Sequence, residues 1–283
     1  MPLSAVPLTV EDHRRDVAGM TYVYPVVSRR AGGVSVGINL NPNNACNWRC
    51  IYCQVPDLAR GGPPPLDLRQ LEAELALLLD EILVGDFMAA RVPPDLRRLA
   101  DVAFSGNGEP TSAREFPQAV AIVEHLLQAH GLATQVKMRL ITNGSLLDRG
   151  SARDGIARIG RAGGEVWFKL DAAGPAAMLR INGVRQEPGR VLRRLALCAE
   201  LCETWVQSCF FAFDGNPPGE PELAAYLEMI ASAGTRIAGV HLYGLARPSL
   251  QPEAARLGRL PAAWLEALAE RIRALGLTAK VSP

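Results

Sequence analysis

Short β-branched or apolar segments alternate with longer segments of helical periodicity along most of this 283-residue chain. Six units of strand followed by helix predict parallel strands joined by right-handed crossovers, which is an α/β fold. Since a closed barrel needs eight such units, we expect an open six-stranded parallel (β/α)6 partial TIM barrel. The expected strands are 33–40, 101–106, 136–142, 165–171, 206–213 and 237–245. The expected helices centre on 68–84, 116–130, 151–162, 188–202, 219–233 and 261–275, and the final LTAKVSP could add an edge strand.

The domain organisation follows from the same pattern. No repeat and no break in composition marks a second domain, so we expect one partial-barrel domain over residues 33–283. Residues 1–32 show little periodicity and are expected to pack on the barrel or cap it. The Pro/Gly-rich stretch 59–67 is typical of a mobile loop, and with the N-terminal segment it is a candidate lid.

Charge and hydropathy exclude several classes of protein. The formal charge of +1 excludes a broad basic field that would grip a nucleic-acid backbone unaided. No run approaches the roughly 20 apolar residues of a membrane span, and the N-terminus lacks the layout of a signal peptide. We therefore expect a cytoplasmic protein with no membrane partner.

Three of the six cysteines lie within eight residues, in NNACNWRCIYCQ directly after the first expected strand. Cys46, Cys50 and Cys53 have the spacing C-x3-C-x2-C, which lets three thiolates from one loop converge on one inorganic centre. A structural zinc site normally needs four ligands, and no other Cys or His lies within thirty residues of this cluster. The pattern favours an iron-sulfur site with one iron free of protein ligands, over zinc or buried thiols.

Two further loops follow expected strands, where the active sites of barrel enzymes lie. SGNGEPT (105–111) places Gly106, Asn107 and Gly108 before Glu109. Small residues let a ligand come close to the backbone, and Glu109 offers it a carboxylate. ITNGS places Asn143 at the mouth of the barrel. A simple turn is the alternative interpretation of both segments.

Charged residues on two later strands are also candidates. In EVWFKLDAAG, alternation directs Lys169 and Asp171 into the barrel, where they need each other or a ligand as partners. Arg247, in LARPS, offers a donor fork to a carboxylate or phosphate, with a surface arginine as the alternative. Lys169 and Arg247 are the candidate catalytic residues.

The remaining cysteines allow two interpretations. Cys198 and Cys202 lie one helical turn apart and Cys209 follows in the next strand, so the three could gather around an auxiliary cluster. Free cysteine is among the most buried residue types, and this helix already directs leucines inward. Packing is the favoured interpretation.

The cysteine motif with aromatic Tyr52 before its last cysteine resembles the hallmark of the radical S-adenosylmethionine (SAM) superfamily. The resemblance implies that Cys46, Cys50 and Cys53 bind three irons of a 4Fe-4S cluster, whose fourth iron chelates the methionine part of SAM. It also implies that Tyr52 packs near the adenine, that residues 106–109 contact the methionine ammonium, and that Asp171 meets the ribose. Asn107 stands where the family often has glycine. Asn143 would be a further cofactor contact.

Further motifs, GNGEPT, ITNGSLL, KLDA and LARPS, resemble the branch related to wyosine-type transfer-RNA modification enzymes. The resemblance implies an oxidoreductase or transferase that cleaves SAM to a 5′-deoxyadenosyl radical, which takes hydrogen from a small-molecule or nucleobase substrate. A reductant such as flavodoxin or ferredoxin would be a partner, whereas the near-neutral charge does not support transfer RNA. The alternatives are a glycyl-radical activating enzyme and a non-catalytic iron-sulfur protein for electron transfer or binding.

Overall fold

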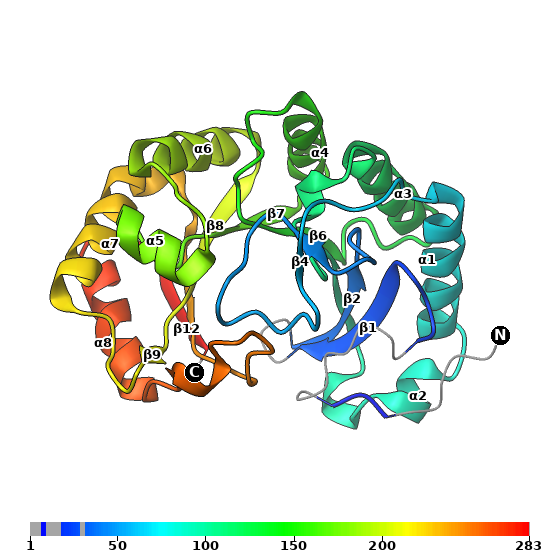
Figure 1. Cartoon of the computed structure of the whole chain (residues 1–283). Coiled ribbons are helices and arrows are strands. Elements are labelled where there is room, and N and C mark those ends of the chain that lie inside the picture. The colour runs from blue at the N-terminus through cyan, green and yellow to red at the C-terminus, as the bar shows by residue number, and fades with distance from the viewer. Residues whose placement is uncertain (1–6, 10–17, 29–31, 283) are drawn as a thin grey trace.

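The computed structural model describes residues 7–9, 18–28 and 32–282. Its centre is a curved sheet of eight strands in the order β1-β2-β5-β6-β7-β8-β10-β12, with β1 and β12 at open edges (Figure 1). The strands are β1 (Val23–Ser28), β2 (Gly33–Ile38), β5 (Leu99–Phe104), β6 (Lys137–Thr142), β7 (Glu165–Lys169), β8 (Glu203–Cys209), β10 (Gly239–Tyr243) and β12 (Ala279–Ser282). Every pairing from β2 to β12 is parallel. The α/β partial barrel expected from the sequence is therefore confirmed.

The sheet has eight strands where six were expected. The six expected strands correspond to β2, β5, β6, β7, β8 and β10, and the expected edge strand is β12. The additional strand, β1, pairs antiparallel with β2. Pro25 weakens its strand signal, and β1 tolerates the proline because it is an edge strand. β1 lies within the predicted extension 1–32, much of which falls outside the described residues, so the division into extension and barrel stays a prediction.

Helices cover the convex side of the sheet, as Figure 1 shows. The α-helices are α1 (Leu68–Leu83), α2 (Phe87–Arg91), α3 (Phe116–Ala129), α4 (Gly150–Arg161), α5 (Pro175–Asn182), α6 (Pro188–Leu201), α7 (Glu220–Ala233) and α8 (Ala262–Arg273). The 3-10 helices are η1 (Pro94–Leu96), η2 (Pro110–Ser112), η3 (Gly234–Arg236) and η4 (Ala254–Arg256). No helix in the described ranges is long and apolar enough to cross a membrane.

Helix α1 shows how the sequence encodes this outer layer. The Asp67 side chain accepts hydrogen bonds from the backbone N–H groups of Arg69 and Gln70, which caps the helix. Its apolar residues recur at helical spacing and are buried: Leu71, Leu75, Leu78, Leu79 and Ile82. These leucines join the core formed with the outward-facing side chains of the strands.

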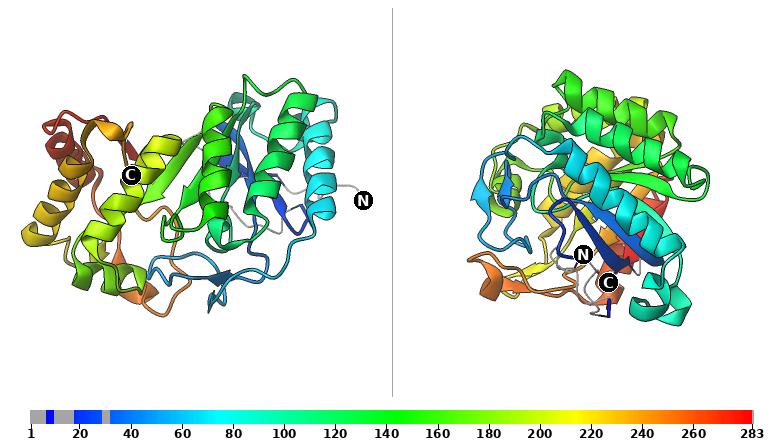
Figure 2. Two further views of the ribbon diagram at one scale, coloured as in Figure 1. Left: turned by 90° about the horizontal axis from the view of Figure 1, so that it is seen from above. Right: turned by 90° about the vertical axis from the view of Figure 1, so that its right-hand side faces the viewer.

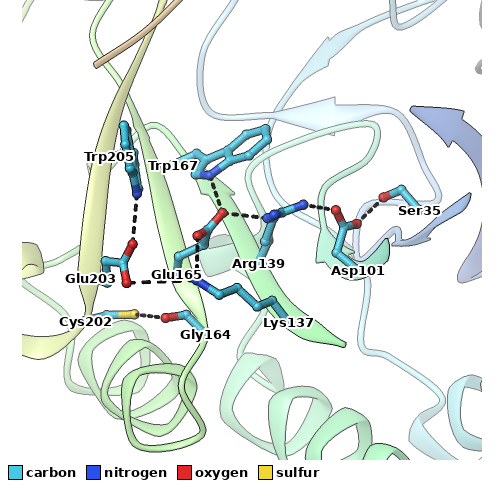
Figure 3. A network of polar contacts seen from close by, with 10 residues as sticks. All are labelled: Ser35, Asp101, Lys137, Arg139, Gly164, Glu165, Trp167, Cys202, Glu203 and Trp205. Carbon is cyan, nitrogen blue, oxygen red and sulfur yellow. Dashed lines mark hydrogen bonds and ion pairs between the residues drawn. The ribbon is translucent and has the colours of Figure 1, made fainter. Parts of the chain in front are cut away.

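The concave side of the sheet carries polar side chains at alternate strand positions. At the amino-terminal end of the strands, Arg139 lies between Asp101 and Glu165 and donates to both carboxylates (Figure 3). Glu165 also accepts a hydrogen bond of 2.9 Å from the indole of Trp167. Because these charges are paired with one another, they leave no unpaired charge at the amino-terminal ends of the strands, and the site is sought at the carboxyl ends.

Two small sheets belong to the loops at that carboxyl end. β3 (Ala45–Cys46) pairs with β4 (Ala59–Arg60), and β9 (Ala212–Phe213) pairs with β11 (Leu257–Gly258). The loop after β2 and the segment after β10 lie at the same end of the molecule, in blue and orange in the left view of Figure 2. These loops surround the candidate site.

Candidate functional site

A cavity of about 1010 Å³ runs from these loops into the barrel. All of the site residues predicted from the sequence line it, with the exception of Asp171: Cys46, Cys50, Tyr52, Cys53, Gly106, Asn107, Gly108, Glu109, Asn143, Lys169 and Arg247. These residues come from loops spread over about two hundred positions of the sequence, and the parallel sheet brings them together. Their individual roles stay predictions.

The cysteine loop (residues 44–56) presents three free, half-buried thiols to this cavity. The backbone N–H of Trp48 donates to Cys46 Sγ at 3.4 Å, and Asn182 Nδ2 lies 3.3 Å from Cys50 Sγ. Burial raises the pKa of Cys46 to about 11 and that of Cys50 to about 12. Without a metal these two thiols are therefore protonated at neutral pH, and metal binding releases their protons.

The segment after β10, residues 247–251, holds the cysteine loop in place. Ser249 Oγ donates to the carbonyl of Ile51 at 2.7 Å, and Gln251 Nε2 donates to the carbonyl of Val55 at 2.9 Å. Arg247 Nε donates to Gln54 Oε1 at 2.9 Å. Arg247 therefore lies at the cavity but is already engaged with the cysteine loop. The sequence analysis missed the contributions of Ser249 and Gln251, whose partners are about two hundred residues away.

The Gly-rich loop (residues 105–109) packs directly against the chain that leads into the cysteine loop. A Cβ on Gly106 would lie 2.3 Å from Asn39 Oδ1, and one on Gly108 would lie 2.2 Å from the carbonyl oxygen of Ala45. Asn107 donates from Nδ2 to Asn44 Oδ1 at 2.6 Å. Its Oδ1 is buried and has no hydrogen-bond partner among the described residues, which leaves one acceptor for a ligand.

Glu109 connects the Gly-rich loop to the end of β6. Its Oε1 accepts from Thr142 Oγ1 at 2.6 Å and from both the hydroxyl and the N–H of Thr111, and its Oε2 accepts from the N–H of Asn143 at 2.7 Å. Burial raises its pKa, although these hydrogen bonds favour the carboxylate. Asn143 Nδ2 in turn donates to Asn47 Oδ1 at 2.9 Å. Glu109 and Asn143 thus connect the Gly-rich loop and the end of β6 to the cysteine loop.

Asp171 is not among the residues that line the cavity, but it lies on the same side of its strand as Lys169, whose ammonium is 4.0 Å from Asp171 Oδ2. β7 ends at Lys169, but the N–H of Leu170 still donates to the carbonyl of Gln207 on β8, so the strand pairing continues toward Asp171. Its Oδ2 accepts from Tyr52 Oη at 2.5 Å and from Asn182 Nδ2 at 2.9 Å, and its Oδ1 accepts from the N–H of Cys209 at 2.9 Å. The side chain has no exposed surface, and Asp171 borders a separate cavity of about 220 Å³. It positions Tyr52, and a ribose contact stays a prediction.

Lys169 lines the main cavity beside two tyrosines. Its ammonium donates to Tyr243 Oη at 3.0 Å and lies 4.0 Å from Asp171 Oδ2 and 5.0 Å from the centre of the Tyr52 ring. Burial disfavours the ammonium, but the Asp171 carboxylate and Tyr243 outweigh this effect, so the pKa of Lys169 is raised well above its usual value. Lys169 is a half-buried cation at the cavity that is paired with Asp171.

The other three cysteines do not form a common site. Cys202 Sγ lies 3.4 Å from the carbonyl of Gly164, and Thr204 Oγ1 donates to Cys198 Sγ at 3.5 Å, both on the outer side of the sheet. Cys209 lies on the cavity side, next to Tyr243. Across the described ranges, no three His, Cys, Asp or Glu side chains are arranged as ligands of a single metal ion.

Comparison with protein families gives a match over most of this region. A sequence model described as the radical SAM superfamily matches residues 40–227, which include the cysteine loop, the Gly-rich loop and strands β5 to β8.

Curated relatives match over shorter stretches. The chain is 28% identical over 123 residues to a GTPase Obg of Brachyspira hyodysenteriae and 26% identical over 159 residues to a UPF0026 protein of Helicobacter pylori. The matches cover 44% and 56% of this chain, but only 15% and 44% of those two proteins. The chain thus spans less than half the length of either relative.

Solved structures share the fold at low sequence identity. A radical SAM methyltransferase from Sphaerobacter thermophilus has a TM-score of 0.59 at 15% identity, with 92% of this chain and 68% of that chain covered. TYW1 with a lysine-pyruvate adduct bound has a TM-score of 0.57 at 17% identity, with 86% and 74% covered. Streptococcus suis SuiB bound to S-adenosylmethionine has a TM-score of 0.56 at 13% identity, with 89% and 48% covered.

Proposed function

Because the chain belongs to the radical SAM superfamily, which uses a 4Fe-4S cluster and S-adenosylmethionine, we propose that it cleaves SAM reductively and directs the resulting radical at a substrate inside the barrel. The observation that carries the proposal is that three free thiols of one loop line the same cavity as the Gly-rich loop and a half-buried lysine. We assign Cys46, Cys50 and Cys53 as the cluster ligands.

The residues of the cysteine loop fit an iron-sulfur cluster. Iron-sulfur clusters are held by thiolates, and all three thiols are free of disulfides and reach the cavity. The N–H of Trp48 and the amide of Asn182 contact two of the sulfurs, and such hydrogen bonds tune the reduction potential of a bound cluster.

The Gly-rich loop fits the cofactor methionine. The buried Oδ1 of Asn107 lacks a donor among the described residues, and an ammonium group supplies one. The side chain of Asn107 would therefore contact the ammonium, at a position where the family often has glycine. The cavity of about 1010 Å³ reaches the upper end of the range of about 300–1,000 Å³ for ligand sites. This volume favours a second small molecule beside the cofactor.

When bound, the cluster and SAM supply a 5′-deoxyadenosyl radical that abstracts hydrogen from the substrate. The role of the chain is to enclose and orient the reactants, because such a radical reacts with most neighbouring groups. Lys169 and Arg247 are the candidate catalytic residues, and we propose that Lys169 binds an anionic part of the substrate. Its raised pKa favours this role over that of a neutral amine, such as would form an adduct like the one in the TYW1 structure.

Further parts of the proposal concern reaction class and partners. We propose an oxidoreductase or transferase that acts in the cytoplasm on a small molecule or nucleobase and receives electrons from a carrier such as flavodoxin or ferredoxin. A glycyl-radical activating enzyme is the second candidate. A bare electron carrier needs neither a large cavity nor a half-buried lysine, which makes this third alternative the weakest.

The decisive experiment measures 5′-deoxyadenosine released from SAM by anaerobically reconstituted, reduced protein. The wild type is expected to release it, and Cys50→Ala is expected to release none. Cys198→Ala is the matched control, because it removes a buried thiol outside the cavity. No release by a wild type with a full cluster, or equal release by Cys50→Ala, would contradict the proposal.

A further inference from the structure

The side chain of Gln207 carries an amide that has no protein partner among the described residues and is reached from the cavity. Gln207 lies on β8, exposes 3% of its surface, and lines the main cavity. In the part of the chain that the structure describes, its side chain has no hydrogen bond, ion pair or ring contact, whereas its backbone carbonyl accepts from Leu170. Buried polar side chains nearly always have partners. The carboxamide therefore presents one acceptor and two donors to the cavity.

Lys169 is the cation next to this amide. Lys169 and Gln207 are paired positions on the parallel strands β7 and β8, so their backbones lie about 4.8 Å apart and their side chains share the concave face. An ammonium has three donors: Tyr243 takes one through a hydrogen bond, and the Asp171 carboxylate pairs with the ammonium at 4.0 Å, which leaves a donor on the cavity side. The Lys169 side chain retains 17% exposure, in contrast to the fully covered Asp171. A donor of Lys169 is thus available beside Gln207.

The other cations of the cavity are committed elsewhere. Arg139 donates to Asp101 and Glu165 and lies 5.1 Å from the centre of the Trp167 ring, at the lower end of the barrel (Figure 3). Arg247 donates to Gln54 in the cysteine loop. A ligand that reaches the middle of the barrel therefore meets Gln207 and Lys169 together.

We propose that Gln207 and Lys169 form a recognition pair for a small anionic substrate that carries an amide, meaning a carbonyl group beside an N–H. The carboxamide of Gln207 pairs with the amide through one accepted and one donated hydrogen bond, and Lys169 binds the nearby carboxylate or phosphate oxygen. The inference rests on the proposed function, since it names the substrate class of the same cavity. Gln207 is the residue that sets specificity, because a site built to bond an N–H rejects an analogue that lacks it.

Two matched fragments test this pair. N-Acetylglycine carries an amide and a carboxylate, and 4-oxopentanoate has the same shape with the N–H replaced by CH2. Their affinities for the full chain with a reconstituted cluster are measured by ligand-observed NMR titration. We expect the wild type to bind N-acetylglycine about tenfold more tightly than 4-oxopentanoate.

The variants test which residues produce the preference for N-acetylglycine. Gln207→Leu is expected to bring the two affinities within about twofold, since neither hydrogen bond remains. Gln207→Glu retains the oxygen that accepts from the ligand N–H and loses the donor, so it should weaken both fragments by charge repulsion while the preference for the amide persists. Lys169→Met should weaken both fragments while the preference for the amide persists. Gln128→Leu, on the exposed face of α3, is the matched control and should behave as the wild type.

The outcomes separate this inference from the proposed function. Equal affinities in the wild type, no saturable binding of N-acetylglycine, or an unchanged preference in Gln207→Leu would each overturn the recognition pair. Release of 5′-deoxyadenosine by the same preparation reports on the proposed function alone. Release without discrimination would leave the proposed function intact, and discrimination without release would leave the recognition pair intact.

Discussion

Asn182 illustrates how single residues outside any motif shape this site. Its side-chain amide contacts both Cys50 Sγ and Asp171 Oδ2, and its backbone carbonyl accepts from the N–H of Arg49. It thereby joins the end of α5 to the cysteine loop and to the residue that positions Tyr52. Desolvation would otherwise penalise each of these buried polar groups.

The packing of the Gly-rich loop gives a prediction at this scale. In Gly108→Ala the new Cβ would lie 2.2 Å from the carbonyl oxygen of Ala45 and 2.6 Å from Asn41 Cγ, so one loop must shift. We expect a loss of about 1–3 kcal/mol in the free energy of unfolding and a lower iron content after reconstitution. Urea denaturation and iron analysis measure the two effects.

Gly150→Ala is the control for this prediction, because a Cβ there meets nothing within 4 Å. It should match the wild type in stability and iron content. A Gly108→Ala variant that is as stable and as iron-rich as Gly150→Ala would show that the two loops do not pack as described.

The residue scale also shows why sequence prediction of the site was incomplete. That the cysteines, residues 106–109 and Lys169 lie at one cavity could be predicted, because each lies at or just after the end of a strand whose pattern is visible in the sequence. Asn182, Ser249 and Gln251 could not, since their role depends on partners brought close by the folded barrel. The contacts that cover Asp171, from Tyr52, Asn182 and the backbone of Cys209, likewise depend on the folded barrel.

At the scale of elements, long periodic segments were predictable and short ones were not. The bounds of α1, α3, α4, α6, α7 and α8 differ from the expected ranges by at most two residues. α5 has only eight residues, which is too few for periodicity to be visible. Gly183 ends α5 with φ 66°, a left-handed conformation that glycine adopts without strain. This short helix nevertheless carries Asn182 to the site.

The end of α6 gives a second prediction, which separates packing from an auxiliary cluster. Burial raises the pKa of Cys198 from 9.0 to about 12. The thiolate is the reactive form, so at pH 8 its fraction is about 1000-fold lower than for a thiol of unshifted pKa. We expect slow alkylation of Cys198 by iodoacetamide at pH 8. The rate should rise with pH as long as the protein stays folded.

Mass spectrometry of the alkylated protein measures this rate before and after removal of iron with a chelator. Cys198 and Cys202 should react equally slowly in both states, and the reconstituted protein should contain about four irons per chain. Alkylation of Cys198 and Cys202 that begins only after iron is removed, or about eight irons per chain, would indicate an auxiliary cluster.

At the scale of the whole molecule, the parallel sheet explains why one cavity collects so many functional groups. Each strand from β2 to β10 ends at the same edge, so loops distant in sequence meet above the barrel. Ion pairs around Arg139 lie at the opposite end of the strands. The alternation of strands and helices predicted this architecture, whereas the depth of the cavity and the unpaired Gln207 within it required the folded structure.

The central claim is that three cysteines of one loop hold a 4Fe-4S cluster whose remaining iron is open to SAM. The most direct measurement is the electron paramagnetic resonance spectrum of the reduced, reconstituted protein before and after SAM is added. The account predicts the signal of a reduced 4Fe-4S cluster whose g-values change when SAM binds, and no such signal from Cys50→Ala. A cluster signal that SAM leaves unchanged in the wild type would contradict the account.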